Sequence, residues 1–150
     1  MDNLTYRKAT KDDVEKIVEL LLEDELGQTR ENKADMQRYI KAFEQINIDL
    51  RQFLMLVIMS DEIVGTCHLT LLPSMTFKGQ TRMQIEAVRV AEKYRGHKIG
   101  EWMINEAIHY GKSNGATMIQ LMTNKTRVQA KKFYEKLGFE ATHEGMKLLF

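Results

Sequence analysis

The feature that most constrains this chain is a strand–helix–strand unit over residues 82–123. Residues 82–90 are rich in strand-forming side chains, a helical pattern begins after Gly96 and Gly100, and residues 118–123 form a short apolar run. A strand, a helix and a second strand in this order require a parallel pair joined by a right-handed crossover. The sequence therefore predicts a sheet that contains at least one parallel pair and has a helix against one face.

The rest of the chain adds antiparallel strands and amphipathic helices. Residues 53–59 and 63–72 are two β-rich runs around a polar turn, which is the pattern of a hairpin. Thr10 and Thr126 are the expected N-caps of the first and last helices. Further strands are expected at residues 4–8 and 139–150, helices at residues 10–22, 36–47, 99–114 and 126–138, and a loop at residues 27–33. The order β-α-α-β-β-β-α-β-α-β predicts an α/β (α+β) fold with a central mixed sheet flanked by helices.

Composition limits the classes of protein to which the chain can belong. It has 150 residues with 22 basic and 21 acidic side chains, and this balance argues against a general nucleic-acid binder. No repeat or linker divides it, so we expect a single domain over residues 1–150. No apolar run approaches the ~18 residues of a membrane-spanning helix, no signal peptide is recognisable, and Cys67 has no disulfide partner. We expect a cytoplasmic domain without a membrane partner.

The turn over residues 94–100, Tyr-Arg-Gly-His-Lys-Ile-Gly, leads directly from a strand into a helix. Backbone N–H groups at a helix N-terminus have no intrahelical partner, and glycine allows close approach of a phosphate. Arg95, His97 and Lys98 add cationic donors. Two interpretations of the turn alone are equally open: a diphosphate-binding turn, or an ordinary connection with solvated basic residues. A Walker A loop and a Gly-x-Gly-x-x-Gly fingerprint are both absent.

The spacing of this turn resembles the acetyl-CoA signature of the GNAT (GCN5-related) N-acetyltransferase superfamily, Gln/Arg-x-x-Gly-x-Gly/Ala. Arg95 stands at the first position and Gly100 at the last, while Lys98 stands where the family usually has glycine. A second family motif, an asparagine followed by a helix that ends Phe-Tyr-x-x-x-Gly-Phe, is matched by Asn124 and residues 133–139. Together with the order of elements, the likeness covers nearly the whole chain.

The resemblance implies an N-acetyltransferase that moves the acetyl group of acetyl-CoA directly to a primary amine of a small molecule or peptide. Acetyl-CoA is the implied co-substrate, no metal is expected, and Tyr134 aligns with the family's acid for the leaving thiolate. The implied cofactor-binding residues are Val88, Arg89, Val90, Arg95, Gly96, His97, Lys98, Ile99, Gly100, Asn124, Arg127 and Phe133. A residue other than glycine at position 98 would still supply its N–H if its φ is negative, provided that its side chain points away from the pyrophosphate. Homodimers are common in the family, but no residue pattern here identifies an interface.

Amine acetylation needs a group that removes a proton from the acceptor. An alkylamine has a pKa near ~10.4, so its neutral form costs on the order of 4 kcal/mol at neutral pH. Glu86, between Ile85 and Ala87 in a strand, is the candidate base. Period-2 alternation places Arg82 and Gln84 on the same face, so we expect both to contact the acceptor. In the alternative interpretation, Glu86 pairs with Arg82 or another arginine on a wet sheet face.

Two other functions stay open at this point. The same fold can serve as a non-catalytic acyl-CoA-binding regulatory module, and a helix N-terminus alone can bind a nucleotide or phosphate. Tyr134 has an alternative role as a core aromatic residue beside Ala130 and Phe133. The sequence does not identify the acceptor amine.

Overall fold

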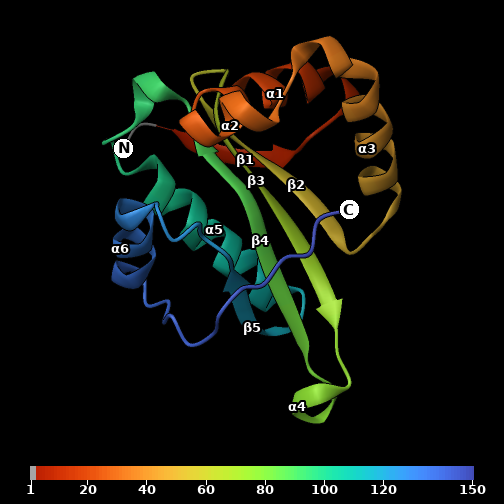
Figure 1. The fold of residues 1–150 in the computed structure, drawn as a ribbon, viewed down its shortest axis with the longest axis vertical. Helices are drawn as coiled ribbons and strands as arrows, with labels where there is room; N and C mark the ends of the chain where they lie inside the picture. The colour runs from red at the N-terminus through yellow and green to blue at the C-terminus, as the bar shows by residue number, and fades with distance from the viewer. Residues whose placement is uncertain (1–2) are drawn as a thin grey trace. The chain divides into compact units, whose positions relative to one another are not determined.

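The computed structural model describes residues 3–150, which form two compact units divided after Gln120. The first unit contains all the helices except the last one, and nearly all of the sheet (Figure 1). Along the chain the elements are β1 (Leu4–Lys8), η1 (Lys11–Asp13), α1 (Val14–Leu22), α2 (Glu25–Arg30), η2 (Lys33–Asp35), α3 (Met36–Ile48), β2 (Gln52–Met59), β3 (Glu62–Pro73), α4 (Thr76–Gly79), β4 (Thr81–Val90), η3 (Glu92–Tyr94), α5 (Ile99–Ser113), β5 (Ala116–Leu121) and α6 (Val128–Lys136).

The strands form one five-stranded sheet in the order β1-β2-β3-β4-β5. The three pairs from β1 to β4 are antiparallel. Between β4 and β5, Thr117 donates a hydrogen bond to Gln80 at 2.7 Å and Gln120 donates one to Gln84 at 2.6 Å. These contacts advance in the same direction along both strands, which is the parallel arrangement that α5 requires as a crossover. The predicted mixed sheet with flanking helices is therefore confirmed.

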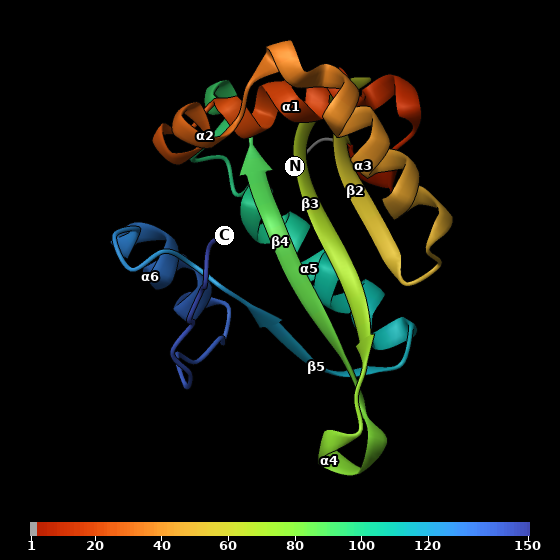
Figure 2. The ribbon, with the colours of Figure 1, turned by 45° about the vertical axis from the view of Figure 1, so that its right-hand side comes forward.

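The two faces of the sheet are covered by different helices. On one face, α1 and α3 pack their apolar stripes on Leu54 and Leu56 of β2. On the other, α5 lies behind β3 and β4 in Figure 2, and the ring of Tyr110 lies 4.5 Å from that of Phe53. Gly111 of α5 sits so close to the sheet that a Cβ there would be 2.9 Å from Cε of Met83. The even-numbered residues of β2 thus face α1 and α3, and the odd-numbered ones face α5.

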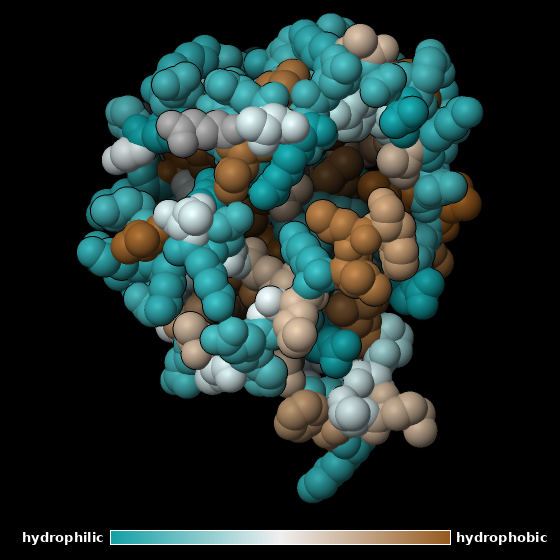
Figure 3. All heavy atoms as spheres, viewed as in Figure 1, coloured by the Kyte–Doolittle hydropathy of each residue, from teal (hydrophilic) through white to brown (hydrophobic). Residues whose placement is uncertain are grey.

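The hairpin of β3 and β4 ends in α4, which carries exposed apolar side chains. Met75 is 96% exposed and Phe77 is 70% exposed. In Figure 3 the outer surface is mostly hydrophilic, and pale and brown spheres gather at the lower tip of the view, over α4. Among residues 3–150, no helix is both long and apolar enough to cross a membrane.

The predicted final strand over residues 139–150 is wrong, because the described chain forms no strand there. Its apolar side chains are exposed, with Leu148 at 80% and Leu149 at 87%. A strand is stable only where a neighbouring strand pairs with its backbone, and no described strand pairs with this segment. Local β-propensity alone therefore gave the wrong result.

Two local predictions are also corrected. Residues 27–33, expected to be a loop, include part of α2, because the Asp24 carboxylate accepts a hydrogen bond from the Gly27 N–H at 2.6 Å and caps that helix. Thr126 does not cap the last helix. Its N–H and its hydroxyl both donate to Oδ1 of Asn124, at 3.0 and 2.9 Å, so α6 begins only at Val128.

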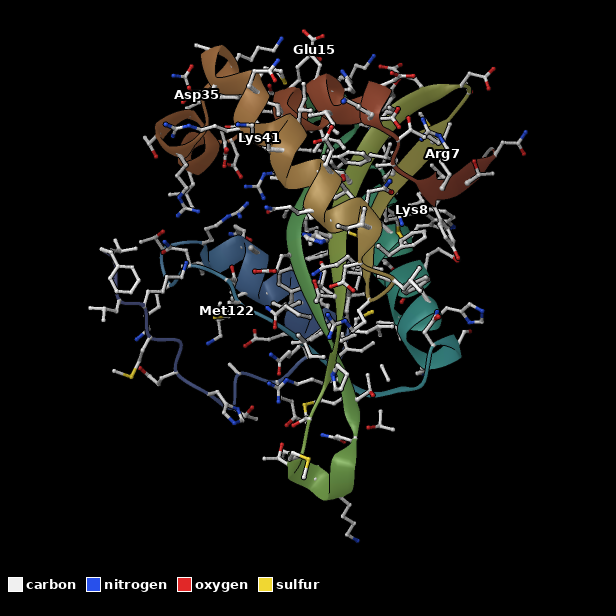
Figure 4. The ribbon with its side chains drawn as sticks, turned by 90° about the vertical axis from the view of Figure 1, so that its right-hand side faces the viewer. Arg7, Lys8, Glu15, Asp35, Lys41 and Met122 are labelled. Atoms are coloured by element: carbon white, nitrogen blue, oxygen red, sulfur yellow. The ribbon has the colours of Figure 1, made fainter. Side chains whose placement is uncertain are left out.

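A bidentate ion pair ties β1 to the start of α1. Nη1 and Nη2 of Arg7, which Figure 4 labels, lie 2.7 and 2.8 Å from the two carboxylate oxygens of Asp13. The Thr10 N–H also donates to Asp13, at 2.7 Å. The Arg7 hydrogen bonds, helped by those from Thr10, lower the pKa of Asp13 to about 2.

We predict that Asp13→Asn lowers the free energy of unfolding at pH 7 by about 1–2 kcal/mol, since the neutral amide loses the ion pair. The folded-state pKa of Asp13 lies below its unfolded value. The stabilisation is therefore complete above about pH 4 and is lost as the pH falls toward 2. Urea unfolding at pH 7 and pH 3 measures the difference between the variant and the wild type.

The matched control is Glu44→Gln, which breaks the exposed ion pair of Glu44 with Lys11 and should change stability by less than about 0.5 kcal/mol. An Asp13→Asn effect that is the same at both pH values would contradict the assignment.

Candidate active site

A β-bulge interrupts β4 just before the turn over residues 94–100, which we call the Arg95 turn. His68 of β3 lies opposite Glu86, whereas Thr66 lies opposite Arg89, so two residues of β4 face one residue of β3. Ala87, within the bulge, has a φ of 50°. A bulge takes one residue out of the ladder, bends the strand and increases its twist. The backbone of β4 therefore leaves its regular pairing with β3 beside the candidate base.

The bulge also changes which face the following side chains occupy. Simple alternation from Glu86 would put Arg89 on the opposite face, but the extra residue puts both on the face covered by α1. There, Nε of Arg89 lies 3.2 Å from Oδ2 of Asp24, and both side chains are largely buried, at 13% and 15% exposure. Nη1 of Arg89 also donates to the carbonyl of Val88, at 2.8 Å. No sequence pattern predicted this pair, because the bulge is not visible in the pattern of β4.

The turn after β4 has backbone N–H groups without an acceptor among the described residues. No residue in the described part of the chain accepts a hydrogen bond from the N–H groups of residues 96–101. Gly96, His97 and Lys98 are exposed, and Ile99 is buried at the first position of α5. Exposed N–H groups at the positive end of a helix dipole form a favourable environment for an anion.

Hydrogen bonds made by the Arg95 side chain and by Glu23 hold this turn in place. Nε of Arg95 donates to the carbonyl of Val90 at 3.1 Å, and its Nη2 donates to the carbonyl of Glu23 at 3.3 Å. The Glu23 carboxylate accepts from the N–H of Glu92 at 2.7 Å. Because Glu23 and Asp24 lie between α1 and α2, the end of α1 contacts both the turn and the bulge.

A second set of contacts joins the turn to the beginning of β3. The Glu62 carboxylate accepts a hydrogen bond from the hydroxyl of Tyr94 at 2.7 Å and pairs with Lys93 at 2.7 Å. Hydrogen bonds from Lys93 and Tyr94 lower the pKa of Glu62. Glu62 is therefore an anion that anchors the turn.

Lys98 does not have a negative φ. Its φ is 60° and its ψ is 11°, so it is left-handed at the N-cap of α5. Gly96, two residues earlier, also has a positive φ, of 81°. The glycine that the family usually has at the position of Lys98 would adopt this conformation without the steric cost of a Cβ.

Glu86 lies in a row of polar side chains on the sheet face. It is exposed, and His68 stands opposite it on β3. Nε2 of His68 lies 2.6 Å from Oε1 of Gln52, which also accepts a hydrogen bond from Thr70 at 2.9 Å. Burial lowers the pKa of His68, and the charge of Glu86 opposes that shift. An accessible carboxylate beside a neutral imidazole can accept a proton from an ammonium group.

The polar row continues along β4 through Gln84 to Arg82. The side chain of Gln84 is buried and held by its 2.6 Å hydrogen bond from Gln120. No ion pair joins Arg82 to Glu86 within residues 3–150, so the alternative in which the two neutralise each other is not found in this structure.

The remaining predicted site residues lie in the second unit, residues 121–150. Asn124 forms the turn before α6, and Arg127 is the N-cap residue of that helix. The ring of Tyr134 lies 5.1 Å from that of Phe133 and 5.9 Å from that of Phe139, both edge-on. Tyr134 thus belongs to an aromatic cluster of its own unit, and its role in proton transfer stays a prediction.

Two other kinds of chemistry find no site in the described residues. Cys67 is buried, and burial raises the pKa of its thiol to about 12, which disfavours the nucleophilic thiolate. No group of three or more His, Cys, Asp or Glu side chains within residues 3–150 is arranged to hold a metal ion.

Residues 14–139 match the family model of the acetyltransferase (GNAT) family, so the chain belongs to that family. It is 34% identical over 86 residues to a glucosamine 6-phosphate N-acetyltransferase from Trypanosoma brucei brucei. That alignment covers 57% of this chain and 56% of the relative, so the chain matches little more than half the length of this curated protein.

Solved structures match over a greater length. A transcriptional regulator from Bacillus halodurans C-125 is 39% identical, with a TM-score of 0.94 over 99% of this chain and 100% of that one. A predicted acetyltransferase with acetyl-CoA from Clostridium acetobutylicum shares the fold at 20% identity, with a TM-score of 0.76 over 98% of this chain and 96% of that one.

The left-handed conformation of Lys98 leads to a stability prediction. Lys98→Gly should raise the free energy of unfolding by about 0.5–1 kcal/mol, because removal of the Cβ strain outweighs the extra entropy of glycine in the unfolded chain. Urea unfolding measures the change. His97→Gly, one residue earlier, is the control and should not stabilise the protein, since His97 is not among the residues with positive φ. Equal effects of the two substitutions would argue against strain at Lys98.

Proposed function

We propose that this protein is an N-acetyltransferase that moves the acetyl group of acetyl-CoA directly to a primary amine of a small molecule or peptide. The observation that carries the proposal is the β4 bulge, which lies between an accessible carboxylate, Glu86, and a turn with unused N–H groups. Membership of the GNAT family supports acetyl transfer. A screen of amines with acetyl-CoA and a free-thiol readout tests it, and CoA release that depends on the amine is the expected result.

In this proposal the N–H groups of the turn bind the pyrophosphate of acetyl-CoA. His97 and Lys98 are exposed beside them and add positive charge, while Arg95 braces the turn through its contacts with Val90 and Glu23. Ile99 and Gly100 begin the helix whose dipole favours the anion. The family resemblance further assigns Asn124, Arg127 and Phe133 to cofactor binding.

The bulge supplies the backbone groups for the acyl end of the co-substrate. Main-chain groups of Val88 and Val90, with Arg89 between them, would pair with the pantetheine arm and with the acetyl carbonyl. A backbone N–H aimed at the carbonyl oxygen stabilises the negative charge that develops there when the amine attacks. The ion pair of Arg89 with Asp24, together with the hydrogen bond from Arg89 to Val88, keeps this segment in place.

The reaction itself requires three proton transfers, two from the acceptor nitrogen and one to the CoA thiolate. Glu86 accepts a proton from the acceptor ammonium, directly or through a water molecule, and the neutral nitrogen attacks the thioester carbon. The tetrahedral intermediate gives up its second nitrogen proton to solvent and then collapses with cleavage of the C–S bond. The CoA thiolate leaves, and Tyr134 is the proposed donor of the proton that it takes up. The products are the N-acetylated amine and CoA.

The proposed base predicts a pH-dependent defect. Glu86→Gln should lower kcat by 10²-fold or more at pH 6 and by much less at pH 9.5, where a larger fraction of the amine is already neutral. Steady-state rates across this range provide the measurement. Glu44→Gln, on the exposed face of α3, is the control and should keep the wild-type profile. A profile of Glu86→Gln parallel to that of the wild type would remove Glu86 from the mechanism.

The proposed pyrophosphate site predicts the effect of a charge reversal. Arg95→Glu should weaken acetyl-CoA binding by at least tenfold, because it removes the brace of the turn and brings a negative charge close to the pyrophosphate. Calorimetric titration with acetyl-CoA is the measurement, and wild-type binding should be micromolar or tighter. Lys112→Glu, at the far end of α5, makes the same charge change and should leave the affinity within twofold. Equal affinities of Arg95→Glu and wild type would refute the site.

A second candidate function is a non-catalytic regulatory module that binds acyl-CoA. It is favoured by one observation, the 39% identity over nearly the whole chain to a protein described as a transcriptional regulator. The two candidates differ in turnover. Acetyl-CoA binding with no amine-dependent thiol release across a broad panel would favour the regulatory module, and turnover would favour the enzyme.

A further inference from the structure

Arg82 is a guanidinium without a counter-ion on the sheet face that also carries Glu86. Within residues 3–150, none of its side-chain nitrogens takes part in a hydrogen bond or an ion pair, and its Nε is buried with no partner. The residue as a whole is only partly exposed. Burying part of a charge without a partner costs free energy, so an unsatisfied nitrogen of this kind calls for an explanation.

The neighbours of Arg82 offer it no anion. Leu72 lies opposite it on β3, Thr70 lies one pair further along opposite Gln84, and none of these side chains carries a charge. On the other side of β4, β5 has the sequence Ala-Thr-Met-Ile-Gln-Leu and contains no acid. The nearest carboxylate along the face on β4 is that of Glu86, four residues away, and it forms no ion pair with Arg82.

We infer that Arg82 binds an anionic group of the acceptor, so that the acceptor is an amine that also carries a phosphate or carboxylate. This inference rests on the proposed function. Guanidinium is permanently charged and its planar fork of donors fits both kinds of anion in a bidentate manner. The anion would supply the counter-ion that residues 3–150 do not provide, and the free-energy cost of partly burying Arg82 is already present in the free enzyme.

The spacing along β4 sets the size of this acceptor. Four residues of extended strand at roughly 3.3 Å each separate the Cα atoms of Arg82 and Glu86 by roughly 13 Å. The two long side chains shorten the gap, so the amine and the anion belong to one small molecule about the size of a sugar phosphate. Gln84, neutral and fixed by Gln120, lies between them and repels neither end.

Matched pairs of acceptors that differ only in the anion test the inference. Glucosamine 6-phosphate against glucosamine tests a phosphate, and 6-aminohexanoate against hexylamine tests a carboxylate. In at least one pair, wild-type kcat/KM should be tenfold or more higher for the anionic member. Arg82→Gln should reduce that ratio at least tenfold, and Arg82→Lys should restore part of it. Arg51→Gln removes an arginine that already pairs with Asp49, at 3.0 Å, and should preserve the ratio.

A binding measurement separates this inference from the proposed function. With CoA at saturation to fill the pyrophosphate turn, calorimetric titration with inorganic phosphate should show binding to the wild type that Arg82→Gln weakens at least tenfold. Thermal denaturation adds a structural control. Because the Arg82 side chain has no partner among the described residues, Arg82→Gln should not lower Tm.

The outcomes divide as follows. Turnover of amines with no preference for the anionic member of either pair would overturn the inference and leave the acetyltransferase proposal intact. If no amine is acetylated, the proposed function fails, and the phosphate titration alone decides the role of Arg82: loss of binding in Arg82→Gln supports it, and equal binding overturns it. A Tm lowered by several degrees in Arg82→Gln, with an unchanged preference, would make Arg82 a structural residue.

Discussion

One extra residue in β4 is the constraint on which the rest of the site depends. Because strand side chains alternate between faces, the bulge at Ala87 reverses the alternation from that point onward. Before it, the polar row ends at Glu86; after it, Arg89 reaches the face covered by α1. A regular strand would place Arg89 against the apolar surface of α5, where a guanidinium has no partner and is costly to bury.

The end of α1 connects the two halves of the site. Asp24 caps α2 and pairs with Arg89 beside the bulge, while Glu23 contacts the Arg95 turn through both its carboxylate and its carbonyl. Movement of α2 would therefore disturb contacts at both the bulge and the turn. Since the Asp24–Arg89 pair is mostly buried, removal of either partner would leave a buried unpaired charge, which is costly in free energy.

The charges are unevenly distributed along the sheet face. Glu86 and Arg82 stand four residues apart without pairing, and the side chains between and opposite them are neutral. Opposite charges that face each other across neighbouring strands stabilise a sheet, but neither Glu86 nor Arg82 has an oppositely charged residue opposite it on β3. Here Gln84 accepts a hydrogen bond from Gln120, and His68 contacts Gln52 while burial lowers the pKa of its imidazole. The charges of Glu86 and Arg82 therefore stay separate on this face of the sheet.

The sequence alone determined the order of the main helices and strands up to the last helix, the mixed sheet and the family, because hydrophobic periodicity and the motif around Arg95 are local properties. Long-range partners decided the rest. The segment 139–150 has strand-like composition but no strand beside it, Lys98 takes a left-handed φ imposed by the turn, and Asp24 begins a helix where Gly27 suggested a loop. The bulge in β4, and with it the partner of Arg89, depends on pairing with β3, and no pattern within β4 itself records that register.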